Sequence, residues 1–101
     1  MSDELKRRFD SAMLNIYRRA KDDAGYNATR FLQMLMEHGG VETAQRLLPS
    51  MSDGFTELWK RGRLDLTVEY LVVQPEWAGL FTDAERDVAK RRLVDSGMRG
   101  L

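Results

Sequence analysis

The chain of 101 residues is 43% hydrophobic and 32% charged, and its 16 basic side chains are balanced by 16 acidic ones. This length predicts one domain with a modest core, and zero net charge disfavours a protein that binds nucleic acid through overall charge. The chain contains no cysteine, which excludes disulfides, a thiol nucleophile and the usual cysteine–histidine zinc sites.

Two features of the sequence bear on where the protein works. The N-terminal residues are acidic and then basic without a following apolar core, so they do not form a secretory signal. No apolar run approaches the ~20 residues that cross a bilayer, and the lack of cysteine fits a reducing compartment. We therefore expect a cytoplasmic protein without membrane contact, whose residues 1–101 form a single helical domain.

The first predicted helix runs from about Ser2 to Asp23 and is stopped by Gly25. Its apolar side chains recur at steps of three and four, which places them on one helix face: Leu5, Phe9, Ala12, Met13, Ile16 and Ala20.

Three shorter helices are predicted next. Asn27 is expected to cap a helix over about residues 28–38, which the glycine pair 39–40 ends. A third helix covers about residues 41–48, and a fourth runs within residues 52–62.

The segment 64–73 alternates apolar and polar residues, as a strand would. A strand needs a partner, and no other segment alternates, so a helix is the better prediction. Asp65 would be its N-cap, and Pro75 would end it. The predicted fold class is all-α: a compact single domain of five or six short helices around this central apolar helix.

A capping box formed by Thr82 and Glu85 predicts the start of the last helix. That helix should end near Ser96, before Gly97. The tail from about residue 97 is expected to fray.

Glu69 is the most notable polar residue of the central segment. A partly buried carboxylate is costly unless it is paired, and the candidate partners are Arg30, Arg61 and Arg63. The alternative is a polar pocket with a perturbed pKa, as in a small hydrolase or metal enzyme centred on Glu69. Asp65 lies four residues earlier, but two carboxylates alone are a weak metal signal.

His38 is the single histidine, and it lies at the predicted end of the second helix. A histidine there interacts favourably with the last carbonyl groups and the helix dipole. The alternative, a catalytic base, needs an orienting partner and a target. No catalytic, cofactor-binding or metal-binding residue is therefore assigned, and no cofactor is expected.

Two surfaces are candidates for binding. Arg7, Arg18 and Lys21 share one face of the first helix and would contact phosphates weakly and without sequence preference.

The two tryptophans have different predicted environments. Trp59 is expected in the core. Trp77 is predicted at the core's rim with one ring face exposed, where Leu80 and Phe81 would help it anchor a protein partner or self-association; alternatively, it only covers the core.

Several stretches of the chain resemble a family of small, uncharacterised bacterial proteins that are all helical. They are AGYNATRFL (24–32), SDGFTELW (52–59), GRLDLTVE (62–69), and PEW (75–77) followed by LFT (80–82). The resemblance spans about Leu14 to Leu93 and implies a single bacterial helical domain, but no activity and no site residue.

The most favoured function is a non-enzymatic binding or accessory module that acts through a protein partner. The alternative is a weak nucleic-acid-associated protein that uses the basic helix faces. A small hydrolase or metal enzyme centred on Glu69 is third.

Overall fold

The computed structural model describes residues 2–100, with the side chains of residues 3–100, and measures 37 × 27 × 20 Å. Its elements are α1 (Ser2–Ala24), α2 (Thr29–Leu47), α3 (Asp53–Lys60), the 3-10 helix η1 (Leu64–Leu66), α4 (Val68–Val72), the 3-10 helix η2 (Pro75–Leu80) and α5 (Asp83–Asp95). Residues 2–100 contain no strand, which confirms the all-α prediction.

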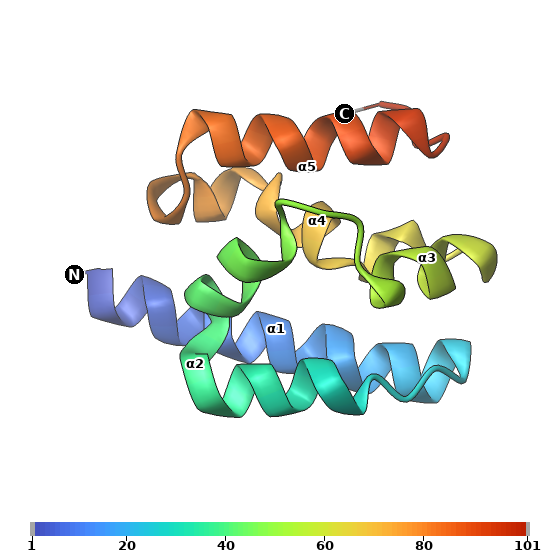
Figure 1. The fold of residues 1–101 in the computed structure, drawn as a ribbon. Coiled ribbons are helices and arrows are strands. Elements are labelled where there is room, and N and C mark those ends of the chain that lie inside the picture. The colour runs from blue at the N-terminus through green and yellow to red at the C-terminus, as the bar shows by residue number, and fades with distance from the viewer. Residues whose placement is uncertain (1, 101) are drawn as a thin grey trace.

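The helices enclose the short α4. Figure 1 shows α1 and the first half of α2 side by side in opposite directions, with α5 on the far side of the molecule beyond α4. α3 lies at the end of the molecule away from the N-terminus. This arrangement leaves α4 in the middle, as the apolar composition of its segment predicts.

The main core is built from nearly every element. Its buried members are Phe9, Met13, Ile16, Leu35, Ala44, Leu48, Val68, Val72, Trp77, Phe81 and Ala89. A smaller cluster joins Ala20, Leu58 and Leu66 at the α3 end. The predicted apolar face of the first helix is therefore confirmed, with Leu5 and Ala12 partly buried beside the core.

α2 consists of two helical segments separated by a kink, as its two glycines predict. Gly39 has φ 79° and ψ 171°, a conformation that L side chains rarely adopt. The next residue, Gly40, lies against α1 and donates its N–H to Asp10 Oδ1 at 2.7 Å. Asp10 thus accepts one of the N–H groups at the start of the second segment, and this contact fixes where α2 turns.

Gly40→Ala should lower the free energy of unfolding by about 1–3 kcal/mol. A Cβ at this position would lie 2.7 Å from Asp10 Oδ1 and 2.9 Å from Phe9 Cδ2, and the Phe9 ring is fully buried. Urea denaturation measures the loss. Gly79→Ala is the matched control, because its Cβ would meet only Leu5 Cδ2 at 3.8 Å. An equal effect of both substitutions would contradict the close packing at Gly40.

The central segment is helical, but it is interrupted. Thr67 is extended (φ −84°, ψ 156°) between η1 and α4. Its Oγ1 accepts the N–H of Tyr70 at 3.2 Å and donates to the carbonyl oxygen of Leu64 at 2.7 Å. Thr67 is therefore the N-cap of α4, and the prediction of Asp65 in that role is wrong. A threonine hydroxyl offers the backbone local hydrogen bonds that compete with a continuous helix.

The last helix begins and ends close to its predicted bounds. Glu85 N–H donates to Thr82 Oγ1 at 3.1 Å, and Thr82 N–H donates to Glu85 Oε1 at 2.8 Å. This reciprocal capping box was predicted. α5 ends at Asp95, with Ser96 as its C-cap.

Candidate functional site

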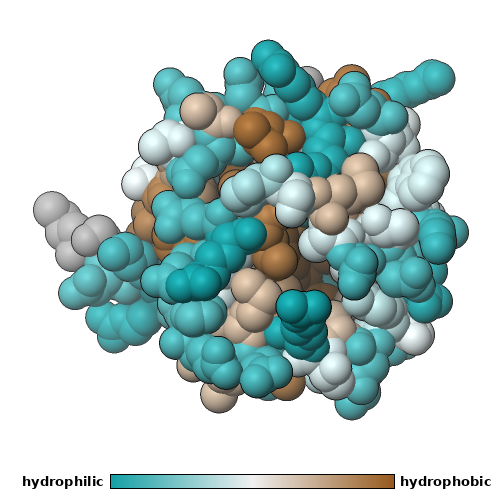
Figure 2. All heavy atoms as spheres, viewed as in Figure 1, coloured by the Kyte–Doolittle hydropathy of each residue, from teal (hydrophilic) through white to brown (hydrophobic). Residues whose placement is uncertain are grey.

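A cavity of about 510 Å³ opens between α1, α2, α3 and the start of α4. Apolar side chains make up a large part of its lining: Ile16, Ala20, Phe31, Met34, Leu47, Met51, Phe55, Leu58, Leu66 and Val68. The polar groups are Tyr17, Tyr26, Asn27, Thr29, Arg30, Arg46, Ser50, Ser52, Asp53, Thr67 and Glu69. Figure 2 shows an apolar recess near the middle of this face, with hydrophilic side chains around it. Its volume lies in the range of about 300–1,000 Å³ that is usual for binding sites.

The starts of α2 and α3 both lie on this cavity, but they are capped differently. Ser52 Oγ accepts the N–H of Phe55 at 3.1 Å and caps α3. The N-cap of α2 is Ala28, which has no side-chain cap. The prediction of Asn27 as that cap is wrong, because Asn27 Oδ1 accepts from the Tyr17 hydroxyl at 3.1 Å instead. That bond ties the loop before α2 to α1.

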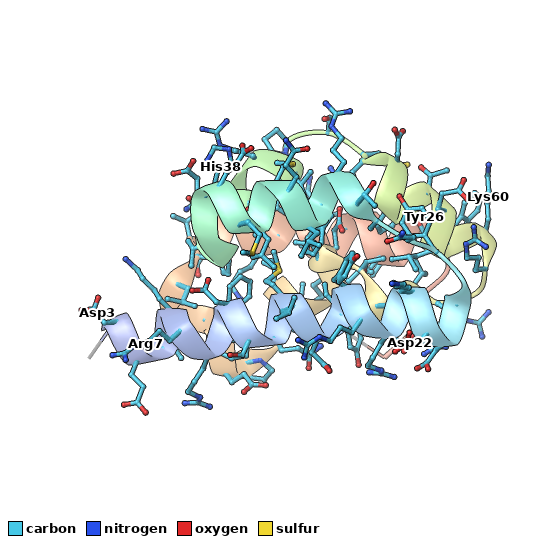
Figure 3. The ribbon with its side chains drawn as sticks, turned by 90° about the horizontal axis from the view of Figure 1, so that it is seen from below. Asp3, Arg7, Asp22, Tyr26, His38 and Lys60 are labelled. Carbon is cyan, nitrogen blue, oxygen red and sulfur yellow. The ribbon has the colours of Figure 1, made fainter. Side chains whose placement is uncertain are left out.

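Tyr26 lies between the end of α1 and α3 (Figure 3). The Arg61 guanidinium is 5.5 Å from the centroid of its ring. Burial raises the pKa of the Tyr26 hydroxyl, and the nearby carboxylates of Glu57 and Asp53 raise it further. Tyr26 therefore contributes a neutral hydroxyl to the cavity.

Glu69 lines the cavity from α4 and is 2% exposed. Its Oε2 accepts from Arg92 Nη1 at 2.7 Å, and Arg92 Nη2 donates to the carbonyl oxygen of Leu48 at 2.7 Å. The ion pair thus joins α4, α5 and the end of α2. The prediction that Glu69 is buried and paired with an arginine is confirmed.

The predicted partners of Glu69 are wrong. Arg63 binds Asp65 at 3.1 Å, Arg61 binds Glu57 at 3.3 Å, and Arg30 lies on the rim of the cavity. The true partner is on α5, because α5 is the helix that covers α4. Its position 23 residues away gives no local signal in the sequence.

The acidic groups around Glu69 do not form a metal site. Asp65 is held by Arg63, and the break at Thr67 places Asp65 and Glu69 on different elements. Although Asp65 and Glu69 are four residues apart, they therefore do not share one face of a continuous helix. Within the described part of the chain, no group of three or more histidine, aspartate and glutamate side chains could hold a metal ion.

Burial raises the pKa of the Glu69 carboxyl, and the hydrogen bond from Arg92 offsets this only in part. The folded protein therefore binds a proton at Glu69 more readily than the unfolded chain does. Protonation favours folding, so the stability that this group contributes should rise as the pH falls and be lost as the pH rises.

The test is urea denaturation of the parent protein and Glu69→Gln at pH about 7 and about 5. The free energy of unfolding of the parent, relative to that of the variant, should increase on acidification. A decrease would mean that Arg92 outweighs burial.

The structure decides between the two environments predicted for Trp77 and corrects the one predicted for Trp59. Trp77 is 4% exposed, so the exposed ring face is wrong and the alternative, that Trp77 covers the core, is confirmed. Its ring packs against Phe9, which also contacts Phe81. Leu80 is partly buried against the same core. Trp59 was predicted in the core, but it is 49% exposed and donates its Nε1–H to the carbonyl oxygen of Ser96 at 3.0 Å. The assignment of Trp77, Leu80 and Phe81 to partner binding stays a prediction.

The basic face of α1 is exposed in the structure. Arg7, Arg18 and Lys21 are all solvent-accessible, with Asp10 and Asp22 also exposed along the same helix. Figure 3 shows Arg7 near the N-terminal end of α1 and Asp22 near its other end. Acidic groups that interrupt a basic stripe weaken its attraction for phosphates. Nucleic-acid binding through these residues stays a prediction.

His38 contacts a carboxylate across the α2 kink. Its Nδ1 is 3.0 Å from Glu42 Oε2, an atom that also accepts from Arg46 Nε at 2.9 Å. The histidine thus connects the two segments of α2 and lies outside the cavity lining.

The cavity was not identified from the sequence. Its lining comes from segments separated along the chain, and no single segment carries its pattern. The lining residues fall within 16–34, 46–58 and 66–69, and no local pattern in these stretches marks them as one site.

No known protein family, curated protein or solved structure matches this chain. The resemblance to small bacterial helical proteins therefore stays a prediction.

No helix within residues 2–100 is both long enough and apolar enough to cross a membrane. The fold and the site define a small all-α domain with a cavity lined by both apolar and polar side chains.

Proposed function

We propose that this protein is a cytoplasmic, non-enzymatic binding module that acts through a protein partner, and that the cavity receives an apolar segment of that partner. The observation that supports the proposal is an open cavity, lined by apolar and polar side chains, whose buried carboxylate, Glu69, is already held by Arg92. We place the partner-binding site in the cavity and not at Trp77, because the Trp77 ring is buried.

The composition of the lining suits a protein contact. Aromatic residues, methionine and arginine are enriched where proteins bind each other. Phe31, Phe55, Met34 and Met51 line the cavity, and Met51 is 56% exposed. Methionine side chains adapt to the shape of a bound group, so they suit a site that receives a partner's side chain.

The alternative of a small hydrolase at Glu69 is weaker. A general acid or base must reach the reacting atom of a substrate and exchange a proton with it. The Oε2 atom of Glu69 is 2.7 Å from Arg92, whose side chain is only 12% exposed, and this pairing serves packing between helices.

A substitution that fills the cavity mouth tests the proposal. Gly54 lines the cavity, and a Cβ there would have Ser52 Oγ and Tyr26 Oη as its nearest neighbours, both at 3.9 Å. Gly54→Phe therefore adds a ring at the mouth without a backbone clash. Gly54→Ala is the matched control, because it adds one methyl group and favours the helix.

The measurement is selection of short random peptides on the immobilised parent protein, followed by titration of the enriched peptides. They should bind the parent and Gly54→Ala alike, and lose about tenfold or more in affinity on Gly54→Phe. The absence of any enriched peptide, or equal binding to Gly54→Phe, would remove the cavity as a protein-binding site.

A further inference from the structure

We infer that the segment bound in this cavity carries an acidic residue beside its apolar anchor, and that the acidic side chain pairs with Arg30 on the rim. The inference rests on the proposed function and specifies the chemistry of the partner. Two observations support it: the charges around the cavity mouth, and the position of Arg30 on α2 relative to the apolar residue Met34.

Four charged side chains line the cavity, and two of them already have partners. Arg46 Nε is 2.9 Å from Glu42 Oε2, and Glu69 is held by Arg92. Arg30 is exposed and has no carboxylate within 4.0 Å among the described residues, and the first turn of α2 contains no acidic residue.

Asp53 is the remaining charge on the rim. It lies in the first turn of α3, where the positive end of the helix dipole stabilises a carboxylate. Arg30 has no equivalent compensation, since it is a cation in the first turn of α2. The rim charge that no neighbouring group of the protein compensates is therefore positive.

The register of α2 relates this charge to the apolar lining. Arg30 and Met34 are four residues apart, which places them on one face of the helix, and both line the cavity. A segment whose apolar side chain reaches Met34 therefore presents an adjacent residue to Arg30. Among the side chains of a protein partner, a carboxylate suits a guanidinium, because it can accept two parallel hydrogen bonds.

The test changes the charge of the peptide and, separately, the charge of the protein at Arg30. An enriched peptide is compared with a version in which its acidic residue is replaced by glutamine, and with a version in which it is replaced by lysine. Each is titrated against the parent, Arg30→Glu and Arg18→Glu. Arg18 is the matched control, because it is an exposed arginine on α1 outside the cavity lining. Arg30→Glu should fold normally, since an acidic residue suits the first turn of a helix.

The parent and Arg18→Glu should bind the acidic peptide about threefold more tightly than its glutamine version, because an ion pair at an exposed rim contributes modestly. Arg30→Glu should lose that preference and bind the lysine version better than the acidic one. Enriched peptides without an acidic bias, or equal binding of the acidic and glutamine versions to the parent, would overturn this inference.

The same peptides separate this inference from the proposed function. If the glutamine version binds as well as the acidic one and Gly54→Phe still removes binding, the cavity remains a protein-binding site and only the acidic partner is excluded. Displacement of the acidic peptide by single-stranded RNA at physiological salt would assign Arg30 to phosphates and overturn the inference.

Discussion

Trp77→Ala should lower the free energy of unfolding by about 3–5 kcal/mol, as large aromatic truncations in cores do. The Trp77 ring is 4% exposed and packs edge-on against Phe9, with the ring centroids 5.3 Å apart. Phe9 in turn packs edge-on against Phe81 at 5.2 Å, so the substitution opens a cavity within a cluster of three rings. Urea denaturation followed by circular dichroism measures the loss.

Trp59→Ala is the matched control for the same residue type. Trp59 is 49% exposed, and its Nε1–H donates to the carbonyl oxygen of Ser96 at 3.0 Å. This substitution should remove one hydrogen bond and part of a ring contact, at a cost of about 1 kcal/mol. A larger loss for Trp59→Ala than for Trp77→Ala would contradict the packing described here.

Glu69→Ala should lower the free energy of unfolding by about 3 kcal/mol or more. The substitution leaves the Arg92 guanidinium, only 12% exposed, with the Leu48 carbonyl but without its carboxylate. Glu69→Gln should cost less, because its amide oxygen still accepts a hydrogen bond from Arg92. Chemical denaturation at neutral pH measures both variants.

Two comparisons identify burial as the cause of that loss. Glu57→Ala removes a surface pair with Arg61, both side chains of which are 37% exposed, and should cost about 0–1 kcal/mol. Replacing Glu69 and Arg92 together with methionine should recover much of the stability lost in Glu69→Ala, since an apolar pair leaves no buried charge. Equal losses in Glu57→Ala and Glu69→Ala would show that the buried pair has no special role.

Local features of the sequence were sufficient to predict the main helices. The apolar side chains of α1 repeat with the helical period, Gly39 takes a conformation that suits glycine, and Thr82 and Glu85 form their capping box within a few residues. Each of these features is decided by groups that are neighbours along the chain. The sequence alone was therefore enough for the all-α class and for most helix bounds.

The sequence also predicted that Glu69 is buried and paired, because it lies in an otherwise apolar segment. It could not identify Arg92 as the partner, since that depends on which helix covers α4. The two tryptophans make the same point, because the packing of η2 against α1 buries Trp77, whereas Trp59 remains 49% exposed.

The cavity belongs entirely to the tertiary structure. Residues as distant as Tyr17 and Glu69 line it, and Arg30 reaches its rim only because α2 returns along α1. The helical period and the capping groups act over one or two turns, so the sequence by itself determined the helices of this protein. Burial, pairing and the shape of the site depend on which faces meet, and only the packed structure decided those.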